Sequence, residues 1–258
     1  MNKQIIEKVR ENTPLIHHLT NQVVMNFTAN GLLSFGAAPV MAKAEEEAAD
    51  MASTADGVLL NIGTLTPNEL KAMISAGKAA NQKDIPVVLD PVGVAATSFR
   101  ADAVKQLLNK VRPTVIKGNA GELAHLIDIP WKTKGVDSVG DGNIEEITRQ
   151  VARTYQTTAI LTGKTDVICT SETTIVNKTG HPILAKVTGA GCLLGSLLAA
   201  CLTTDDSIEE QALTAVQFYG LAAEYAASYE DVQASGTFIP HFIDALSLDA
   251  EFLKGAIV

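Results

Sequence analysis

The sequence predicts a three-layer α/β/α fold, in which a mainly parallel sheet lies between two layers of helices. Short, continuously apolar segments alternate with longer segments of helical pattern along most of the chain. Strands that are apolar without interruption are buried on both faces, as in parallel sheets covered by helices. A length of 258 residues with 47% hydrophobic residues suits one large core, so we expect residues 1–258 to form a single domain.

Four apolar runs of strand length form the expected parallel part of the sheet. They are Gly57–Gly63, Pro86–Asp90, Thr114–Gly118 and Thr158–Gly163. The segment Asp166–Lys178 differs, because it alternates in polarity and is rich in Thr, Val and Ile. That pattern is typical of half-buried antiparallel strands, so it predicts a hairpin at one edge of the sheet.

Helix signals occupy the segments between and after these strands. Thr66 and Glu69 have the spacing of a capping box, which predicts a helix that extends to about Gln82. Ser207 and Glu210 have the same spacing and predict a second helix start. The other expected helices are Ala101–Lys110, one from near Asn119, Gly191–Cys201 and Phe238–Phe252.

Charge and cysteine content exclude several classes of protein. The net charge is -9 and no run of Lys or Arg occurs, so we expect no nucleic-acid partner. Three cysteines without a CxxC spacing indicate neither a disulfide framework nor a zinc site, and they suit a reducing compartment. The N-terminus lacks the apolar core of a signal peptide, and no apolar run is long enough to span a bilayer. We therefore expect a cytoplasmic protein that does not bind membranes.

The sharpest chemical signal is the turn Gly189-Ala190-Gly191-Cys192, which leads directly into an apolar helix. Glycine lets the backbone approach a ligand closely, and the free N–H groups in the first turn of a helix attract an anion. The turn is therefore suited to a phosphoryl group, although an ordinary turn into a buried helix has the same pattern. No GK[ST] follows the glycines, so this segment is not a P-loop.

Polar residues at the carboxyl ends of the expected strands are further candidates, because ligands of such sheets bind there. Asp90, Lys117 and Thr162 end three of the strands. Each also has a structural reading, as a turn residue, a solvated lysine and a local hydroxyl hydrogen bond. Asn119 and Glu122 have the spacing of a helix cap, in which Glu reaches back to the first backbone N–H.

Several stretches resemble the hydroxyethylthiazole kinases of the ribokinase-like superfamily. The Gly-Ala-Gly turn is similar to the anion hole of that superfamily, whose members usually have Asp where this chain has Cys192. Cys at this place resembles both the thiazole kinases and the hydroxymethylpyrimidine phosphate kinases. The other stretches favour the thiazole kinases and together cover essentially the whole chain. They are His17–Asn21, Asn26–Gly31, Ala38–Ala42, Asn61–Leu65, Asp90–Gly93 and Lys117–Glu122.

The resemblance implies an ATP-dependent kinase that phosphorylates hydroxyethylthiazole, a thiazole alcohol, in thiamine salvage, and it implies a homotrimer. It implies that Asp90 and Glu122 hold Mg²⁺, which takes only one or two carboxylates besides phosphates and water. It implies that Lys117 and Thr162 contact ATP. The family more often has Arg at the position of Lys117, and a lysine contacts phosphate less directionally.

On the acceptor side, the resemblance places Met41 against the thiazole ring, with Asn21 as a second candidate for substrate binding. Gly189 admits the hydroxyethyl arm to the anion hole formed by residues 189–192. Cys192 then lies near the attacking oxygen, and the helix N-terminus is expected to lower the pKa of its thiol. Phosphoryl transfer through a loose transition state depends more on positioning than on proton removal. We therefore expect Cys192 to assist catalysis without being indispensable.

Two alternatives remain open from the sequence. One is a related kinase of a pyrimidine or pyridoxal alcohol, because these kinases share the anion hole. The other is a non-catalytic nucleotide-binding protein on the same fold. The carboxylates of Asp90 and Glu122 argue against the second alternative, because binding alone does not need them.

Overall fold

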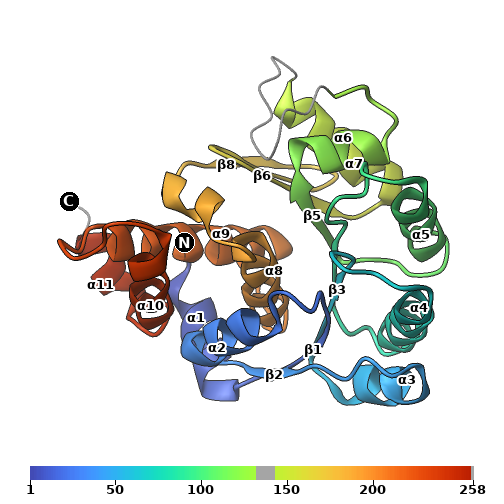
Figure 1. The fold of residues 1–258 in the computed structure, drawn as a ribbon, viewed down its shortest axis with the longest axis horizontal. Coiled ribbons are helices and arrows are strands. Elements are labelled where there is room, and N and C mark those ends of the chain that lie inside the picture. The colour runs from blue at the N-terminus through green and yellow to red at the C-terminus, as the bar shows by residue number, and fades with distance from the viewer. Residues whose placement is uncertain (132–142, 257–258) are drawn as a thin grey trace.

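The computed structural model describes residues 1–131 and 143–256 and contains an eight-stranded sheet between two layers of helices (Figure 1). The strand order is β2-β1-β3-β4-β5-β6-β7-β8. Strands β1 to β6 are parallel, whereas β7 and β8 continue the sheet as an antiparallel hairpin. The strands are β1 Leu15–Leu19, β2 Ala38–Val40, β3 Gly57–Asn61, β4 Val87–Asp90, β5 Val115–Asn119, β6 Thr158–Thr162, β7 Asp166–Cys169 and β8 Thr174–Asn177. The expected three-layer fold with an antiparallel edge is confirmed.

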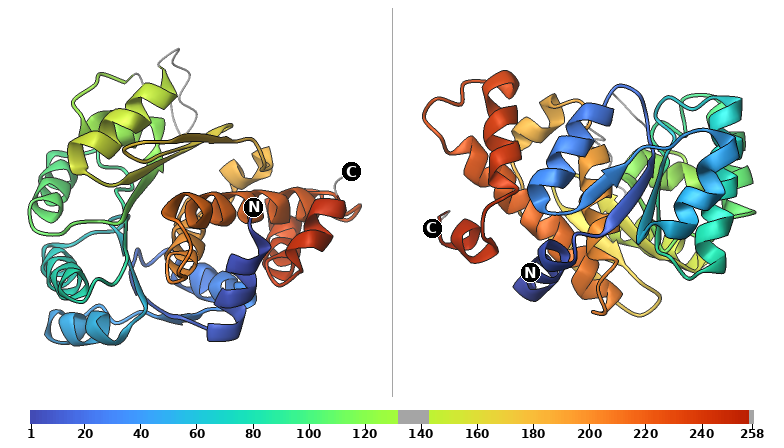
Figure 2. Two further views of the ribbon diagram at one scale, coloured as in Figure 1. Left: turned by 180° about the vertical axis from the view of Figure 1, so that it is seen from behind. Right: turned by 90° about the horizontal axis from the view of Figure 1, so that it is seen from below.

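Each face of the sheet has its own hydrophobic core and its own helices (Figures 1 and 2). One face is covered by α3 Glu45–Thr54, α4 Pro67–Gln82, α5 Ser98–Leu108, α6 Ala120–Leu126 and α7 Ile144–Tyr155. The other is covered by α1 Lys3–Asn12, α2 Met25–Phe35, α8 Ala190–Cys201, α9 Ile208–Ala227, α10 Ser235–Ala245 and α11 Ala250–Gly255, with a 3₁₀ turn at Pro182–Lys186. Among the described residues, no helix combines the length and the apolar character needed to cross a bilayer.

Helix α8 lies at the centre of its layer and is buried on nearly all sides. Every residue from Ala190 to Cys201 except Gly191 is buried. The helix contacts β1, β3 and β4 on one side and α9 on another. A helix that is apolar all round can be stable only in such a position. Its first turn lies beside the carboxyl ends of these strands, where Gly191 is exposed.

Most of the expected elements are present, with one correction. The capping box of Thr66 and Glu69 begins α4 as expected, and Ser207 caps α9 by accepting a hydrogen bond from the N–H of Glu210. The single helix expected over Phe238–Phe252 is wrong. It is two helices, because Asp249 turns its carboxylate onto the N–H groups of Glu251 and Phe252 and so caps a new helix.

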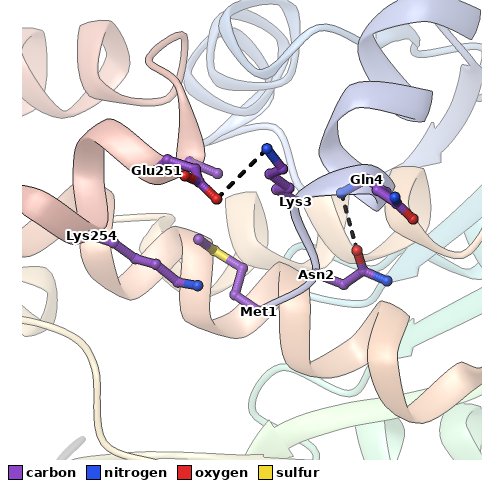
Figure 3. Close-up of a pocket in the computed structure, with 7 residues that line it drawn as sticks. Met1, Asn2, Lys3, Gln4, Glu251 and Lys254 are labelled. Atoms are coloured by element: carbon purple, nitrogen blue, oxygen red, sulfur yellow. Dashed lines mark hydrogen bonds and ion pairs between the residues drawn. The ribbon is translucent and has the colours of Figure 1, made fainter.

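The first residues of the chain and α11 lie side by side on the α8 side of the sheet. Figure 3 shows a shallow hollow between the first residues and α11, where Lys3 Nζ lies 3.7 Å from a carboxylate oxygen of Glu251. Asn2 caps α1 by accepting a hydrogen bond from the N–H of Gln4. None of the candidate site residues lines this hollow.

Candidate active site

The carboxyl ends of four neighbouring strands place polar side chains in one row across the sheet. Asn61 of β3 pairs with Asp90 of β4. The registers of the adjoining pairs, continued by one residue, place Thr20 beside Asn61 and Lys117 beside Asp90. Side chains alternate between the faces of a strand, so all four lie on the same face as Leu59, toward α8. All four are buried, although polar side chains of this kind usually lie at the surface.

Asp90 is held by two donors on the same carboxylate oxygen. Its Oδ2 accepts a hydrogen bond from Asn61 Nδ2 at 2.9 Å and lies 3.3 Å from Lys117 Nζ. Among the described residues none donates a hydrogen bond to Oδ1. Burial raises the pKa of Asp90 to about 6, against the opposing charge of Lys117. Burial lowers the pKa of Lys117, but the carboxylates of Asp90 and Glu122 outweigh it and raise this pKa, so the pair is ionic at neutral pH.

The carboxylate of Glu122 caps helix α6 and also belongs to the candidate site around Asp90. Its Oε2 accepts from the N–H of Asn119 at 2.9 Å, while Asn119 accepts from the N–H of Glu122 at 2.9 Å, so the capping box is present. Its Oε1 accepts from the N–H of Gly93, in the loop that follows Asp90, at 2.9 Å. The charge of Glu122 is close enough to raise the pKa of Asp90. Each of its oxygens retains a lone pair that can face bound water.

The turn before α8 brings backbone N–H groups to the same place. Gly189 has a φ of 89°, a conformation that favours glycine, and a β-carbon there would collide with the side chain of Val24. A β-carbon at Gly191 would lie 3.5 Å from Lys117 Nζ, so the ammonium group lies directly against the first turn. The helix N-terminus and this lysine together form a site for an anion.

Cys192 receives two amide donors on its sulfur. Asn61 Nδ2 lies 3.2 Å from Sγ and Asn21 Nδ2 lies 3.4 Å from it. Burial, followed by the charge of Asp90, raises the pKa of the thiol. The expectation that the helix N-terminus lowers this pKa is therefore wrong, because a buried helix start beside a carboxylate disfavours a second negative charge. The thiol is the resting form.

Asn61, like Thr20, is a residue of this row to which the sequence assigned no role. It ends the apolar run of β3 in the same way as Asp90 ends β4 and Lys117 follows the apolar residues of β5. That shared position is the signal that could have found it. An asparagine before a glycine-containing loop is more readily explained as a turn residue.

The remaining predicted residues lie on either side of this cluster along the strand ends. Met41 directly follows β2 and is half-buried. Its loop is tied to α4 by the ion pair of Lys43 Nζ with Glu69 Oε1 at 2.6 Å. Thr162 ends β6, where its hydroxyl donates to the carbonyl of Gly118 at 3.4 Å.

The carboxylates fit a magnesium ion better than a metal that needs a closed cage. Within the described ranges, no three His, Cys, Asp or Glu side chains cluster as a metal site. Mg²⁺ takes one or two carboxylates and completes its shell with water and phosphate oxygens. The open Oδ1 of Asp90 and the partly engaged carboxylate of Glu122 suit that arrangement.

Comparison with known proteins gives a consistent result over nearly the whole chain. Residues 6–251 match the model of the Hydroxyethylthiazole kinase family. The chain is 59% identical over 247 residues to Hydroxyethylthiazole kinase 1 of Oceanobacillus iheyensis, covering 96% of each protein. It is similar to the structure of a hydroxyethylthiazole kinase protein from Pyrococcus horikoshii OT3, with a TM-score of 0.88 and 36% identity over 97% of this chain and 94% of that one. A ribokinase-like superfamily protein from Enterococcus faecalis V583 shares the fold, with a TM-score of 0.68 and 16% identity over 99% and 95% of the two chains.

Proposed function

This chain belongs to the hydroxyethylthiazole kinase family, and we propose that the residues around Asp90 carry out that family's reaction. The chain is a kinase that phosphorylates the hydroxyl of hydroxyethylthiazole with ATP, in thiamine salvage. The observation that carries the assignment of the site is the position of Lys117, between the carboxylate of Asp90 and the first turn of α8. An ammonium group beside free backbone N–H groups is the arrangement that a phosphoryl group in transfer requires.

On the nucleotide side, we propose that Lys117 and the N–H groups of Gly189, Gly191 and Cys192 neutralise the migrating phosphoryl group. The N–H of Ala190, also expected in the anion hole, donates to the carbonyl of Val187 at 3.2 Å and is not free. Lys117 is fixed by its ion pair with Asp90, so its charge needs no reorganisation during the reaction. We propose that the nucleotide extends along the strand ends toward Thr162, which lies two strands beyond Asp90 in the sheet.

We propose that Asp90 and Glu122 hold Mg²⁺ beside the ATP phosphates, largely through water. When bound, Mg²⁺ supplies positive charge that shields the phosphate oxygens from the attacking hydroxyl. Asn61 and Lys117 contact Oδ2 of Asp90, so Oδ1 would be available to Mg²⁺ or to its bound water. The backbone N–H groups of Gly93 and Asn119 fix the orientation of Glu122 in the same way.

On the acceptor side, we propose that Met41 contacts the thiazole ring, that Asn21 borders the substrate, and that Gly189 admits the hydroxyethyl arm. A polarizable thioether suits a neutral aromatic ring. Cys192 contacts the attacking oxygen, and its raised pKa means that it assists by contact more than as a preformed thiolate base.

We further propose that residues 1–258 act as one kinase domain, that the protein is a homotrimer, and that it works in the cytoplasm. The single sheet shared by β1 to β8 supports the first point. The trimer rests on the resemblance to the family, and the cytoplasm on three buried cysteines without a disulfide. Light scattering on the purified protein measures the subunit number, and a monomeric mass would contradict the trimer.

The decisive experiment measures ATP consumption by the purified protein with Mg²⁺ and hydroxyethylthiazole, with hydroxymethylpyrimidine and pyridoxal in parallel. We expect turnover with the thiazole alcohol and little with the other two. Turnover confined to another alcohol would contradict the acceptor, and ATP binding without any turnover would contradict the kinase activity itself.

A further inference from the structure

We propose that Asn61 is a positioning residue that fixes Asp90 and Cys192 in one geometry and so couples the phosphate side of the site to the acceptor side. The inference rests on the proposed function, because it concerns the same site. Asn61 touches one candidate metal ligand and one residue at the acceptor oxygen through a single amide group.

The place of Asn61 in the sheet is the first support. Strand β3 lies between β1 and β4. The strands on one side, β1 and β2, lead into Asn21 and Met41, which we assign to the acceptor. The strands on the other side, β4 and β5, carry Asp90 and Lys117, which we assign to the phosphates and the metal. Asn61 is thus the residue of the row at which the two halves meet.

The second support is that the amide of Asn61 has no spare hydrogen-bonding capacity. Its Nδ2 donates to Asp90 Oδ2 at 2.9 Å and to Cys192 Sγ at 3.2 Å. Its Oδ1 accepts from the N–H of Gly63 at 3.0 Å and from Asn21 Nδ2 at 3.1 Å. Two donors and two acceptor positions are all that such an amide possesses.

The orientation of this amide follows from the same contacts. A backbone N–H can only donate, so the side of Asn61 that faces Gly63 must be the carbonyl oxygen. The amide nitrogen therefore faces Asp90 and Cys192. Asn21 closes a triangle by donating both to Asn61 Oδ1 and to Cys192 Sγ. None of these groups can rotate without breaking a hydrogen bond in a buried site, which is costly.

The consequence for catalysis is a fixed distance between two reacting partners. Asn61 holds Oδ2 of Asp90, so that Oδ1 would be available to Mg²⁺, and it holds the sulfur of Cys192 on the acceptor side. Without this link the acceptor and the phosphate can each bind but are no longer aligned with one another. Misplacement by about 1 Å costs on the order of 10²-fold in rate.

The test compares kcat and KM of the wild type with those of Asn61→Leu, which keeps the branching of the side chain and removes all four hydrogen bonds. We expect kcat to fall on the order of 10²-fold, while KM for ATP and KM for hydroxyethylthiazole each change less than about 3-fold. Asn61→Ser retains one hydroxyl donor, and we expect its kcat to lie between those of the wild type and Asn61→Leu. It also serves as the folded variant if the leucine variant does not fold, which thermal unfolding determines.

Asn81 supplies the matched control. It bridges α4 to the loop before β5, with its Nδ2 2.9 Å from the carbonyl of Arg112 and its Oδ1 2.7 Å from the N–H of Arg112. Asn81→Ala removes two amide hydrogen bonds near the amino end of the strands and should lower the melting temperature without changing kcat.

The possible results separate this proposal from the proposed function. An active wild type with kcat of a folded Asn61→Leu within about 3-fold of it would overturn the role of Asn61 alone, and so would the same result for Asn61→Ser if the leucine variant does not fold. An equal rise in both KM values at unchanged kcat would do the same, because it would indicate a binding role. A wild type that phosphorylates no alcohol would overturn the proposed function, and the role of Asn61 with it.

Discussion

The phosphate side and the acceptor side of the active-site edge differ in burial and in charge. On the phosphate side, Asp90 and Lys117 are almost fully buried and hold each other, while Glu122 is oriented by two backbone N–H groups. On the acceptor side, β2 has only three residues, none of them buried, and Met41 follows it half-buried in a loop. Charges that act on a phosphoryl group must be fixed before the reaction, whereas an apolar ring requires only a surface that fits. The difference predicts large losses in turnover on one side and changes in acceptor KM on the other.

The largest effect is expected for Lys117→Met, which tests the phosphate side directly. The substitution removes the ammonium group and leaves Asp90 buried without its counter-charge. We expect kcat to fall on the order of 10³-fold, and the free energy of unfolding to fall by about 3–5 kcal/mol. Steady-state kinetics and denaturant unfolding measure both. Lys110→Met, at an exposed position, is the control. Wild-type kcat in Lys117→Met would remove this lysine from the phosphate site.

Gly189→Ala is the next largest, because it tests whether the turn before α8 needs its special backbone. The φ of 89° and the side chain of Val24 both oppose a β-carbon at this position. We expect kcat to fall on the order of 10²-fold, with about 1–2 kcal/mol lost in stability.

The control for this turn is Gly180→Ala. Gly180 has a φ of 133°, and no atom lies within 4 Å of a β-carbon built there, so an alanine at this position would strain the backbone without a collision. Its variant should lose stability and keep its kcat. A Gly189→Ala enzyme with unchanged kcat would show that the turn is not part of the transfer site.

Cys192 lies at the boundary between the two halves and should give an intermediate effect. We expect Cys192→Ala to lower kcat by about 10-fold, since the thiol assists without being a preformed base. Cys192→Asp should keep or exceed wild-type activity if the position accepts a proton. Cys201→Ala, at a fully buried position of the same helix, is the stability control. Complete loss of turnover in a folded Cys192→Ala enzyme would make the thiol indispensable and contradict this view.

Met41→Ala sharpens the comparison on the acceptor side. Loss of one half-buried thioether contact should raise KM for hydroxyethylthiazole by about 5- to 10-fold, corresponding to about 1 kcal/mol, and leave KM for ATP unchanged. Met51→Ala, a half-buried methionine on α3, is the matched control. A fall in kcat with constant KM would place Met41 in the transfer step instead.

The smallest expected effect on activity, but a clear one on stability, concerns His18, which joins the acceptor-side strand β1 to α8. Its Nδ1 lies 2.9 Å from the carbonyl of Ile16 and its Nε2 lies 2.9 Å from Ser196 Oγ. The carbonyl only accepts, so Nδ1 carries the proton and Nε2 accepts from the serine. Burial lowers the pKa of His18 to about 4, so the folded protein holds it neutral.

The sign of the pH dependence follows from this pKa. Below about pH 6.5 the unfolded chain binds a proton at this histidine and the folded chain does not, so stability falls as the pH falls from about 6.5 toward 4. The full effect is about 3 kcal/mol. Burial lowers the pKa of His17 too, in the same direction. Urea unfolding at several pH values should therefore show a shallower slope for His18→Gln than for the wild type, and equal slopes would contradict the prediction.

The strands that the sequence predicted and those that it did not predict differ in one physical respect. The runs from Gly57 to Thr162 are continuously apolar because helices cover both of their faces. Strand β1 contains the buried residues His17 and His18, whose Nε2 atoms contact the carbonyl of Ala42 and the hydroxyl of Ser196, partners that lie far away in the sequence. Strand β2 is too short to show any period. Partners that come from tertiary structure leave no local pattern.

The same distinction applies to the active site. Asp90 and Lys117 were predicted because a charged residue at the end of an apolar run stands out. The role of Asn61 depends on four contacts, to residues that lie between 2 and 131 positions away, and no local pattern announces such a set. The direction of the pKa shift of Cys192 depends on burial by other elements, so it also required the structure.

Helix α8 has a consequence for how the chain reaches this structure. Its surface is apolar on every side and has no face suited to water. Until β1, β3, β4 and α9 are in place, the apolar surface of the helix is exposed and can associate with other chains. Its docking depends on contacts that are distant in sequence and therefore form slowly. Because the phosphate site begins at the first turn of α8, the enzyme becomes active only after this helix has packed against the sheet and α9. The yield of active enzyme on refolding should consequently decline as the protein concentration rises.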